Sequence, residues 1–301
     1  MTSRVSTRPA NTGTADSGAT GSGTTATRRR YTKVDPIPWW LKTLGGFVVA
    51  FFILPTLFVI PMSFSDAKTF QFPPRGFSWR LYENFFTNPV WLDSLGNSFL
   101  VATLTAVLAT VVGTAAAVAL SRLRGRTAQL VRTLLMVPIV APAIVVAVAV
   151  YISFLRWQLT GTVTGYVLAH TAIAVPYMIV SVTGALGGFD PQLLKASASL
   201  GASPLRSFVR VTMPLISRGI LTGAIFAFIV SFDEVVIALF LRSPTFQTMP
   251  VQMYNSVTVE IDPTISAASS LMVVAVTVVF ILPQLRRGRR GRRQESHADN
   301  T

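Results

Sequence analysis

Long stretches of the chain carry no charged side chain, and short charged segments separate them. Five stretches of at least 23 residues contain no Asp, Glu, Lys or Arg, namely 43–65, 94–121, 133–155, 157–189 and 263–285. A sixth apolar segment, 219–241, is interrupted only by Asp233 and Glu234. A helix that crosses the ~30 Å hydrocarbon core of a bilayer needs about 20 apolar residues. The pattern therefore predicts an all-α membrane protein with six transmembrane helices.

The composition agrees with this prediction and argues against other classes. Charged residues make up 13% of the 301 residues and hydrophobic residues 51%, whereas soluble domains average about 25% charged residues. The chain has no Cys and two His, so it lacks the groups for a disulfide framework, a thiolate nucleophile or a metal site of several Cys or His ligands. An intramembrane enzyme would also need a second acidic cluster. We therefore predict no catalytic residue and no metal ligand.

The distribution of basic residues predicts how the helices are oriented. With six spans, the segments 1–42, 122–132, 190–218 and the C-terminal tail share one side of the membrane and carry 21 of the 26 Lys and Arg residues. Basic residues close to membrane helices are retained in the cytoplasm. Both termini are therefore predicted to be cytoplasmic, and this topology explains most of the formal net charge of +14.

Composition also divides the chain into parts. These are a disordered cytoplasmic tail at 1–38, the first transmembrane helix and external loop at 39–94, the remaining five helices at 95–285, and a basic cytoplasmic tail at 286–301. In the external loop, Trp79, Tyr82 and Phe86 share one face at helical spacing. This spacing predicts a short helix that lies on the membrane surface or packs against the protein.

The basic C-terminal tail permits a second interpretation of the protein. Six Arg residues between Arg286 and Arg293 could bind the phosphates of a nucleic acid or hold the tail on an anionic lipid surface. Their position directly after a predicted span favours a topological anchor. We therefore expect contact with membrane lipid and no specific nucleic-acid partner.

Several features of the inner helices indicate that the bundle forms a pathway through the membrane or a moving part, and not only a membrane anchor. The helix at 95–120 is rich in Gly, Ala and Thr, which lets helices approach closely in lipid. Pro138, Pro142 and Pro176 lie within predicted spans, where they kink helices and free backbone carbonyls. His170 stands alone on an apolar helix, and we expect it to hydrogen-bond to a neighbouring helix.

The cytoplasmic segment 190–218 has the pattern of two short helices. It begins with an Asp-Pro pair that favours a helix start, and Gly201 ends this first helix. Pro204 starts a second, amphipathic turn, and Pro214 is expected to end it. The residues of this turn expected to face the bundle are Leu205, Phe208, Val209 and Val211. Such a loop is either a docking element or an ordinary packed connection, and the residue pattern favours neither.

This segment resembles the coupling motif of binding-protein-dependent ABC importer permeases, Glu-Ala-Ala-x3-Gly-x9-Ile-x-Leu-Pro. The residues at the motif positions are Lys195, Ala196, Ser197, Gly201, Val211, Met213 and Pro214. The spacing is kept, but Ser197 replaces an Ala and Lys195 replaces the acidic residue. The resemblance extends over 96–285, where segments such as SFDE and MPVQMY look like the branch of spermidine/putrescine-type permeases.

The resemblance implies the type I ABC importer permease (MetI-like) bundle, in the inner membrane of a bacterial cell. It implies three partners: a cytoplasmic ABC ATPase dimer that grips 190–218, a second, related permease subunit, and an extracytoplasmic solute-binding protein. The chain lacks the phosphate-loop pattern G-x-x-x-x-G-K-[ST], so ATP and Mg²⁺ are expected on the ATPase and no cofactor on this chain. The implied solute is a small cation such as spermidine or putrescine; an opine or an amino-acid-like solute is the alternative.

Asp233 and Glu234 are the only charged residues within a predicted span. A charged side chain at the centre of a bilayer costs roughly 2.5–3.5 kcal/mol on insertion scales, and no Lys or Arg lies in another predicted span. We therefore expect the two acids to face a wet cavity, a partner subunit or a cationic solute, or to be protonated. Two roles stay open for them, attraction of a cation along the substrate pathway and capping or hydrogen bonding between helices.

Overall fold

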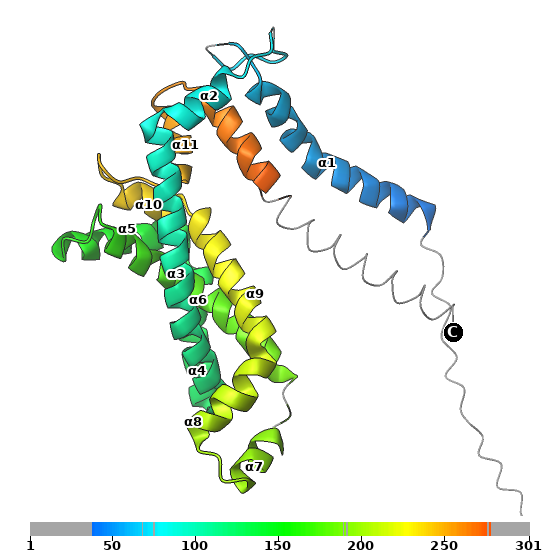
Figure 1. Cartoon of the computed structure of the whole chain (residues 1–301), viewed down its shortest axis with the longest axis vertical. Coiled ribbons are helices and arrows are strands. Elements are labelled where there is room, and N and C mark those ends of the chain that lie inside the picture. The colour runs from blue at the N-terminus through cyan, green and yellow to red at the C-terminus, as the bar shows by residue number, and fades with distance from the viewer. Residues whose placement is uncertain are drawn as a thin grey trace, which may run out of the picture. The chain divides into compact units, whose positions relative to one another are not determined.

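The computed structural model describes residues 38–277 except 68, 75, 189, 191 and 276, and these residues form helices joined by turns, with no β-strand among them (Figure 1). The chain divides into two units, Met1–Val49 and Ala50–Thr301. The predictions for most of the N-terminal tail and for the basic tail at 286–301 lie outside the described residues.

The helices follow one another closely along the chain. They are α1 (Trp39–Ser63), α2 (Arg80–Thr87), α3 (Pro89–Arg122), α4 (Gly125–Val140), α5 (Ala143–Arg156), α6 (Val163–Gly187), α7 (Gln192–Ser199), α8 (Pro204–Ser207), the π-helical turn η1 (Phe208–Thr212), α9 (Met213–Phe232), α10 (Val236–Leu241) and α11 (Met249–Thr258). An apolar helix over Thr264–Ala275 follows α11.

Four helical stretches of the described part are long and apolar enough to cross a membrane. They are α1, α3, α6 and the run Pro204–Phe232, which joins α8, η1 and α9. The bent pair of α4 and α5 gives a fifth candidate. The sixth predicted span, 263–285, is described only as far as residue 277, so the count of six stays a prediction.

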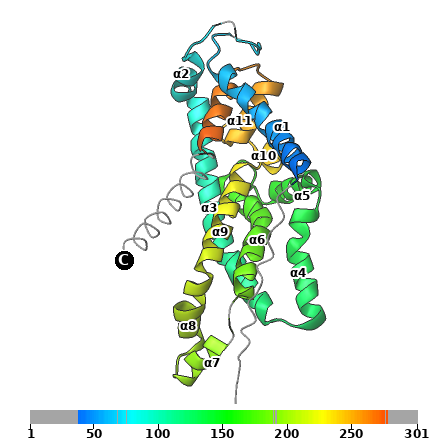
Figure 2. The same cartoon turned by 90° about the vertical axis from the view of Figure 1, so that its right-hand side faces the viewer.

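The span predicted at 133–155 is not one continuous helix. α4 ends at Val140, α5 begins at Ala143, and the two helices are bent by 99° (Figure 2). Pro142 has no N–H for the helical ladder and disfavours helical backbone in the residue before it. Ala141 is accordingly extended, with ψ 139°. Pro138 lies inside α4 without ending it.

The short helix predicted in the external loop is present as α2. Its buried residues are Leu81 and Phe85, while Trp79 and Phe86 stay exposed. The side chain of Tyr82 is tied to the protein, because its hydroxyl lies 2.7 Å from Ser63 Oγ. The predicted aromatic face is thus mostly turned outward, and the helix packs through the neighbouring face.

Small residues line the faces along which α3, α6 and α9 pack together. On α9 the buried residues recur mostly at every fourth position, as Gly219, Gly223, Ala227 and Ser231. On α3 the same spacing gives Thr105, Ala109, Gly113 and Ala117. Close backbone approach of this kind is how helices associate in lipid, where apolar burial gives no drive.

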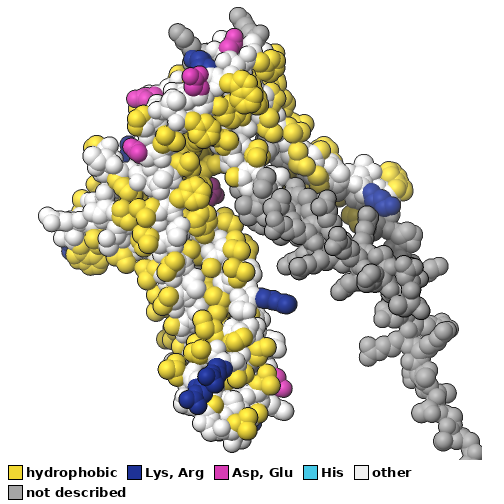
Figure 3. All heavy atoms as spheres, in the orientation of Figure 1, with side chains coloured by type: hydrophobic (Ala, Val, Ile, Leu, Met, Phe, Trp, Pro, Cys, Tyr) yellow, Lys and Arg dark blue, Asp and Glu magenta, His cyan; other side chains and the backbone are white. Residues whose placement is uncertain are grey.

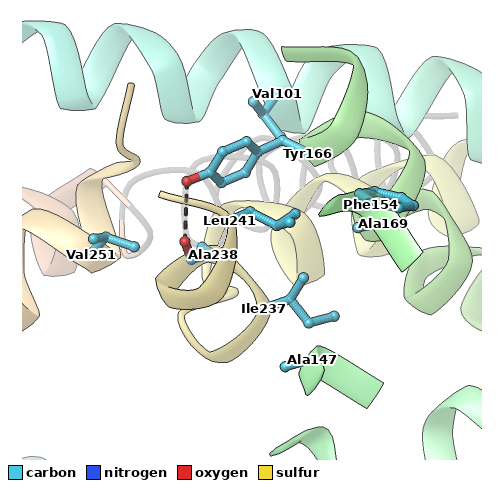
Figure 4. Close-up of a cluster of buried hydrophobic side chains, with 9 residues drawn as sticks. All are labelled: Val101, Ala147, Phe154, Tyr166, Ala169, Ile237, Ala238, Leu241 and Val251. Atoms are coloured by element: carbon cyan, nitrogen blue, oxygen red, sulfur yellow. Dashed lines mark hydrogen bonds between the residues drawn. The ribbon is translucent and has the colours of Figure 1, made fainter. Parts of the chain in front are cut away.

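A second apolar cluster surrounds the short helix α10. Its buried members are Val101, Ala147, Phe154, Tyr166, Ala169, Ile237, Ala238, Leu241 and Val251 (Figure 4). They come from α3, α5, α6, α10 and α11, so this cluster fixes α10 among four other helices.

Charged side chains are unevenly distributed on the face drawn in Figure 3. Hydrophobic side chains cover the helices, a cluster of Lys and Arg lies at the end that carries α7 and α8, and most of the visible Asp and Glu lie toward the other end, near α2, where Lys or Arg is present as well (Figure 3). The basic cluster lies where the positive-inside rule expects it if α7 and α8 are in the cytoplasm.

Candidate functional site

The first half of 190–218 folds as the sequence predicts. The Asp190 carboxylate accepts a hydrogen bond from the backbone N–H of Gln192 at 2.9 Å and caps α7. Gly201 follows α7 with a φ of +77°, a conformation that costs little only for glycine. An added Cβ would meet no atom within 4 Å, so the backbone angle alone explains why glycine stands here.

The second half of the segment differs from the prediction at Pro214. The helix that begins at Pro204 does not end there but continues through η1 into α9. In η1 the Met213 N–H donates to the Phe208 carbonyl, five residues back, so this turn is wider than an α-helical one. The wider turn leaves room for the proline ring, which in a regular helix clashes with a carbonyl of the preceding turn.

Two of the four side chains predicted to face the bundle do not do so, since Phe208 and Val211 are half-buried but Leu205 and Val209 are exposed. Leu205 is 73% exposed and Val209 50% exposed, so neither packs into the bundle. Ser207 and Thr212 are the buried residues. The amphipathic pattern predicts a separate short turn, whereas these residues belong to a longer helix. That helix packs through the face that carries its small side chains.

A pair of serines holds α7 against α8. The Ser197 and Ser207 hydroxyl oxygens lie 2.6 Å apart, and Ser197 is the residue that departs from the Ala of the motif. Lys195 and Ala196 on α7 are exposed. The structure therefore presents the first motif positions on an outer surface, while Val211 and Pro214 lie on the helix that leads into the membrane.

We expect Ser197→Ala and Ser207→Ala to weaken this contact without unfolding the bundle. A hydrogen bond of this kind contributes about 0.5–1.5 kcal/mol, so each substitution should lower the free energy of unfolding by about that amount. The double substitution should cost little more than either one, because both remove the same bond. The measurement is thermal unfolding of the detergent-solubilised protein. Strictly additive losses would contradict a shared bond.

The acidic pair lies at a break between two helices and not inside one. α9 ends at Phe232, Asp233 follows as its C-cap, and α10 begins at Val236. The single helix predicted over 219–241 is therefore wrong at 233–235. No Pro or Gly lies between Gly223 and Leu241, so the local sequence gives no signal for the interruption.

The two acids differ in what they contact. Glu234 Oε1 accepts a hydrogen bond from the Ile237 backbone N–H at 2.8 Å and caps the start of α10. This contact matches the capping role that the sequence left open. Asp233 is exposed and stands at the C-terminal end of α9, where the last backbone carbonyls have no partner further along the helix. The carboxylates and the negative end of the helix dipole together favour a positive charge at this point.

Helix α6 contacts both sides of the break. His170 Nδ1 lies 2.9 Å from Ser231 Oγ on α9, which confirms the predicted hydrogen bond of His170 to a neighbouring helix. The Tyr166 hydroxyl donates to the Ala238 carbonyl of α10 at 3.1 Å (Figure 4). The sequence analysis missed Tyr166 and Ser231. For Tyr166 the available signal is its position one turn before His170, on the same face of α6.

The segment 190–218 and the acidic break lie at opposite ends of α9. The 20 residues of α9 correspond to about 30 Å at 1.5 Å per residue. The structure thus does not bring the two sets of predicted site residues together, but α8, η1 and α9 connect them as one helical run (Figure 1).

Comparison with known proteins identifies relatives among transport permeases. The profile of the family described as "Binding-protein-dependent transport system inner membrane component" matches residues 109–287. The spermidine/putrescine transport system permease protein PotC of Haemophilus influenzae is 29% identical over 82% of this chain and 96% of its own. PotC of Escherichia coli K12 is 30% identical over 80% of this chain and 92% of its own. The putrescine permease PotI of E. coli is 35% identical, over 37% of this chain and 40% of its own.

A solved structure shares the fold. A chain of a bacterial ABC transporter involved in the import of the acidic polysaccharide alginate matches with a TM-score of 0.65 and 16% identity, over 84% of this chain and 96% of its own. The family profile covers more than half of this chain, and the PotC proteins match it over nearly their whole length. The chain therefore belongs to the family of binding-protein-dependent transport system inner membrane components.

Proposed function

We propose that this chain is the permease subunit of an ATP-driven importer and that it translocates a small cationic solute of the polyamine type. The observation that carries the proposal is the exposed Asp233 carboxylate at the end of α9. An ionised carboxylate between membrane helices needs a positive partner or water. The PotC relatives are spermidine/putrescine permeases, and a polyammonium solute supplies the charge that this site lacks.

The exposed surface of α7 supports the proposed ATPase partner. This surface, with Lys195 and Ala196, is the part that a closing ATPase dimer would push. The ATPase, and not this chain, would bind ATP and Mg²⁺. The continuous run from α8 to α9 would carry the displacement toward the break at 233–235. Lys195 suits an ATPase that offers an acidic group at this contact.

Two further partners complete the proposed importer. A second, related permease would cover the face on which Asp233 lies, and an external binding protein would deliver the solute at the end that carries α2. The solved alginate transporter in complex with its loaded periplasmic protein is an example of such an arrangement in a protein that shares the fold.

The experiment that tests the proposed function is solute uptake by the reconstituted complex. The permease pair, the ATPase and the binding protein are placed in proteoliposomes, and ATP-dependent uptake of labelled spermidine and putrescine is measured with opines and neutral amino acids as competitors. We expect uptake of the polyamines and no competition at equal concentration. Uptake of an opine or amino acid in preference to polyamines would overturn the cationic assignment and leave the importer assignment intact.

A further inference from the structure

Two fully buried side chains of α6 bridge the break between α9 and α10. Tyr166 and His170 lie one turn apart and therefore on the same face of the helix, and both are 0% exposed. One is bonded to Ser231, two residues before Asp233, and the other to Ala238, three residues after Val235. Their rings are in edge contact, with centroids 5.8 Å apart.

The break needs such external contacts because the local sequence favours a continuous helix. The segment from 224 to 241 is apolar apart from Ser231, Asp233 and Glu234 and contains no Pro or Gly. Ending α9 at Phe232 leaves backbone carbonyls without helical partners in an apolar surrounding, which is unfavourable. The Glu234 cap on the Ile237 N–H is one local contact that favours the break, and the other contacts must come from packed neighbours.

The contacts of α6 hold the helices on both sides of the break. Tyr166 on α6 donates to Ala238 O in the last turn of α10, and Gly161 N, in the connection before α6, donates to Leu241 O at 2.9 Å. Ser231 in the last turn of α9 is held by His170. Both α9 and α10 are thus bonded to α6, which limits how far the two helices can move relative to each other.

We propose that Tyr166 and His170 are positioning residues that hold the break at 233–235 in one fixed arrangement and thereby set where the Asp233 carboxylate lies. The inference rests on the proposed function for its effect on transport, but not for its effect on the geometry of the break. Neither side chain is required to touch the solute.

The absence of cysteine in the chain allows a direct test of this geometry. Val235→Cys places a single thiol in the break, and its rate of reaction with a water-soluble thiol reagent is measured in membrane vesicles that contain the full complex. Tyr166→Phe, which removes one oxygen atom, and His170→Leu should each raise that rate about three- to tenfold, because the segment 233–235 is then held less tightly and exposes the thiol to water more often.

Two matched variants separate positioning from general packing. His170→Asn keeps a polar group near the Nδ1 position and should restore a rate close to that of Val235→Cys alone. Ser181→Ala removes another bond between α6 and α9, from Ser181 Oγ to Gly219 O at 2.8 Å, far from the break, and should leave the rate unchanged. An unchanged rate in Tyr166→Phe and His170→Leu, or an equal rise in Ser181→Ala, would overturn the proposal.

Transport measurements on the same variants distinguish this proposal from the proposed function. The two disruptive variants should raise the KM for polyamine uptake several-fold with a smaller effect on the maximal rate, and His170→Asn should restore it. A raised labelling rate with an unchanged polyamine KM would keep the positioning role and instead count against the cationic site at Asp233.

Discussion

Replacing Asp233 by Asn is expected to raise the KM for polyamine uptake about 10- to 100-fold. Asn keeps the size of the side chain and removes its negative charge. A hydrogen bond to a charged group contributes about 1.5–3 kcal/mol, and each 1.4 kcal/mol corresponds to a factor of about ten. The carbonyls at the end of α9 remain in place, so residual affinity for a cation should persist. The measurement is the concentration dependence of labelled spermidine uptake by the reconstituted complex.

Glu234→Gln is the matched control for Asp233→Asn. It also removes one negative charge, but the amide oxygen can still accept the Ile237 N–H that now bonds Glu234 Oε1 at 2.8 Å. We expect a smaller rise in KM, because this carboxylate is already engaged as a cap. Asp233→Glu should recover part of the lost affinity. A KM for spermidine that is unaltered by Asp233→Asn would exclude the carboxylate as an attractor of the solute.

The apolar pattern predicts the membrane helices well because their length is set by the bilayer. Each stretch without charges in the described part contains helix, and α1, α3 and α6 match their predicted ranges closely. Pro142 indicates a bend between α4 and α5, but the bend angle of 99° depends on the helices against which α5 packs. A sequence pattern therefore predicts where a helix ends more readily than the direction of the next helix.

The break at 233–235 could not be predicted from the local residues. It is maintained by tertiary contacts of Tyr166 and His170, which lie more than 60 residues away in sequence. Pro214 shows the opposite error, since a residue that usually ends a helix is accommodated by the π-helical turn before it. Tertiary contacts at the break, and a local change of helix type before Pro214, thus override the preference of the residues themselves.

Substituting Gly219 by Leu is expected to destabilise the bundle more than any other single change considered. A Cβ at this position would lie 2.5 Å from the Ala185 Cβ and 3.0 Å from the Ser181 carbonyl oxygen. Neither atom is the end of a flexible side chain, so α6 and α9 must separate. Overpacking of this kind costs about 1–3 kcal/mol or more, and the separation also breaks the bond from Ser181 Oγ to the Gly219 carbonyl.

Gly184→Leu provides the control for this substitution. Gly184 lies on α6 near the same level, and an added Cβ there would meet no atom within 4 Å. Both substitutions remove a glycine from a helix interior, which by itself is favourable by up to about 1 kcal/mol, so a difference between them reports the contact of α6 with α9. The measurement is thermal unfolding of the detergent-solubilised permease complex. Equal melting temperatures for the two variants would mean that α6 and α9 do not pack as closely as Gly219 indicates. The run from α8 through α9 would then lack the close contact with α6 that fixes its position in the bundle.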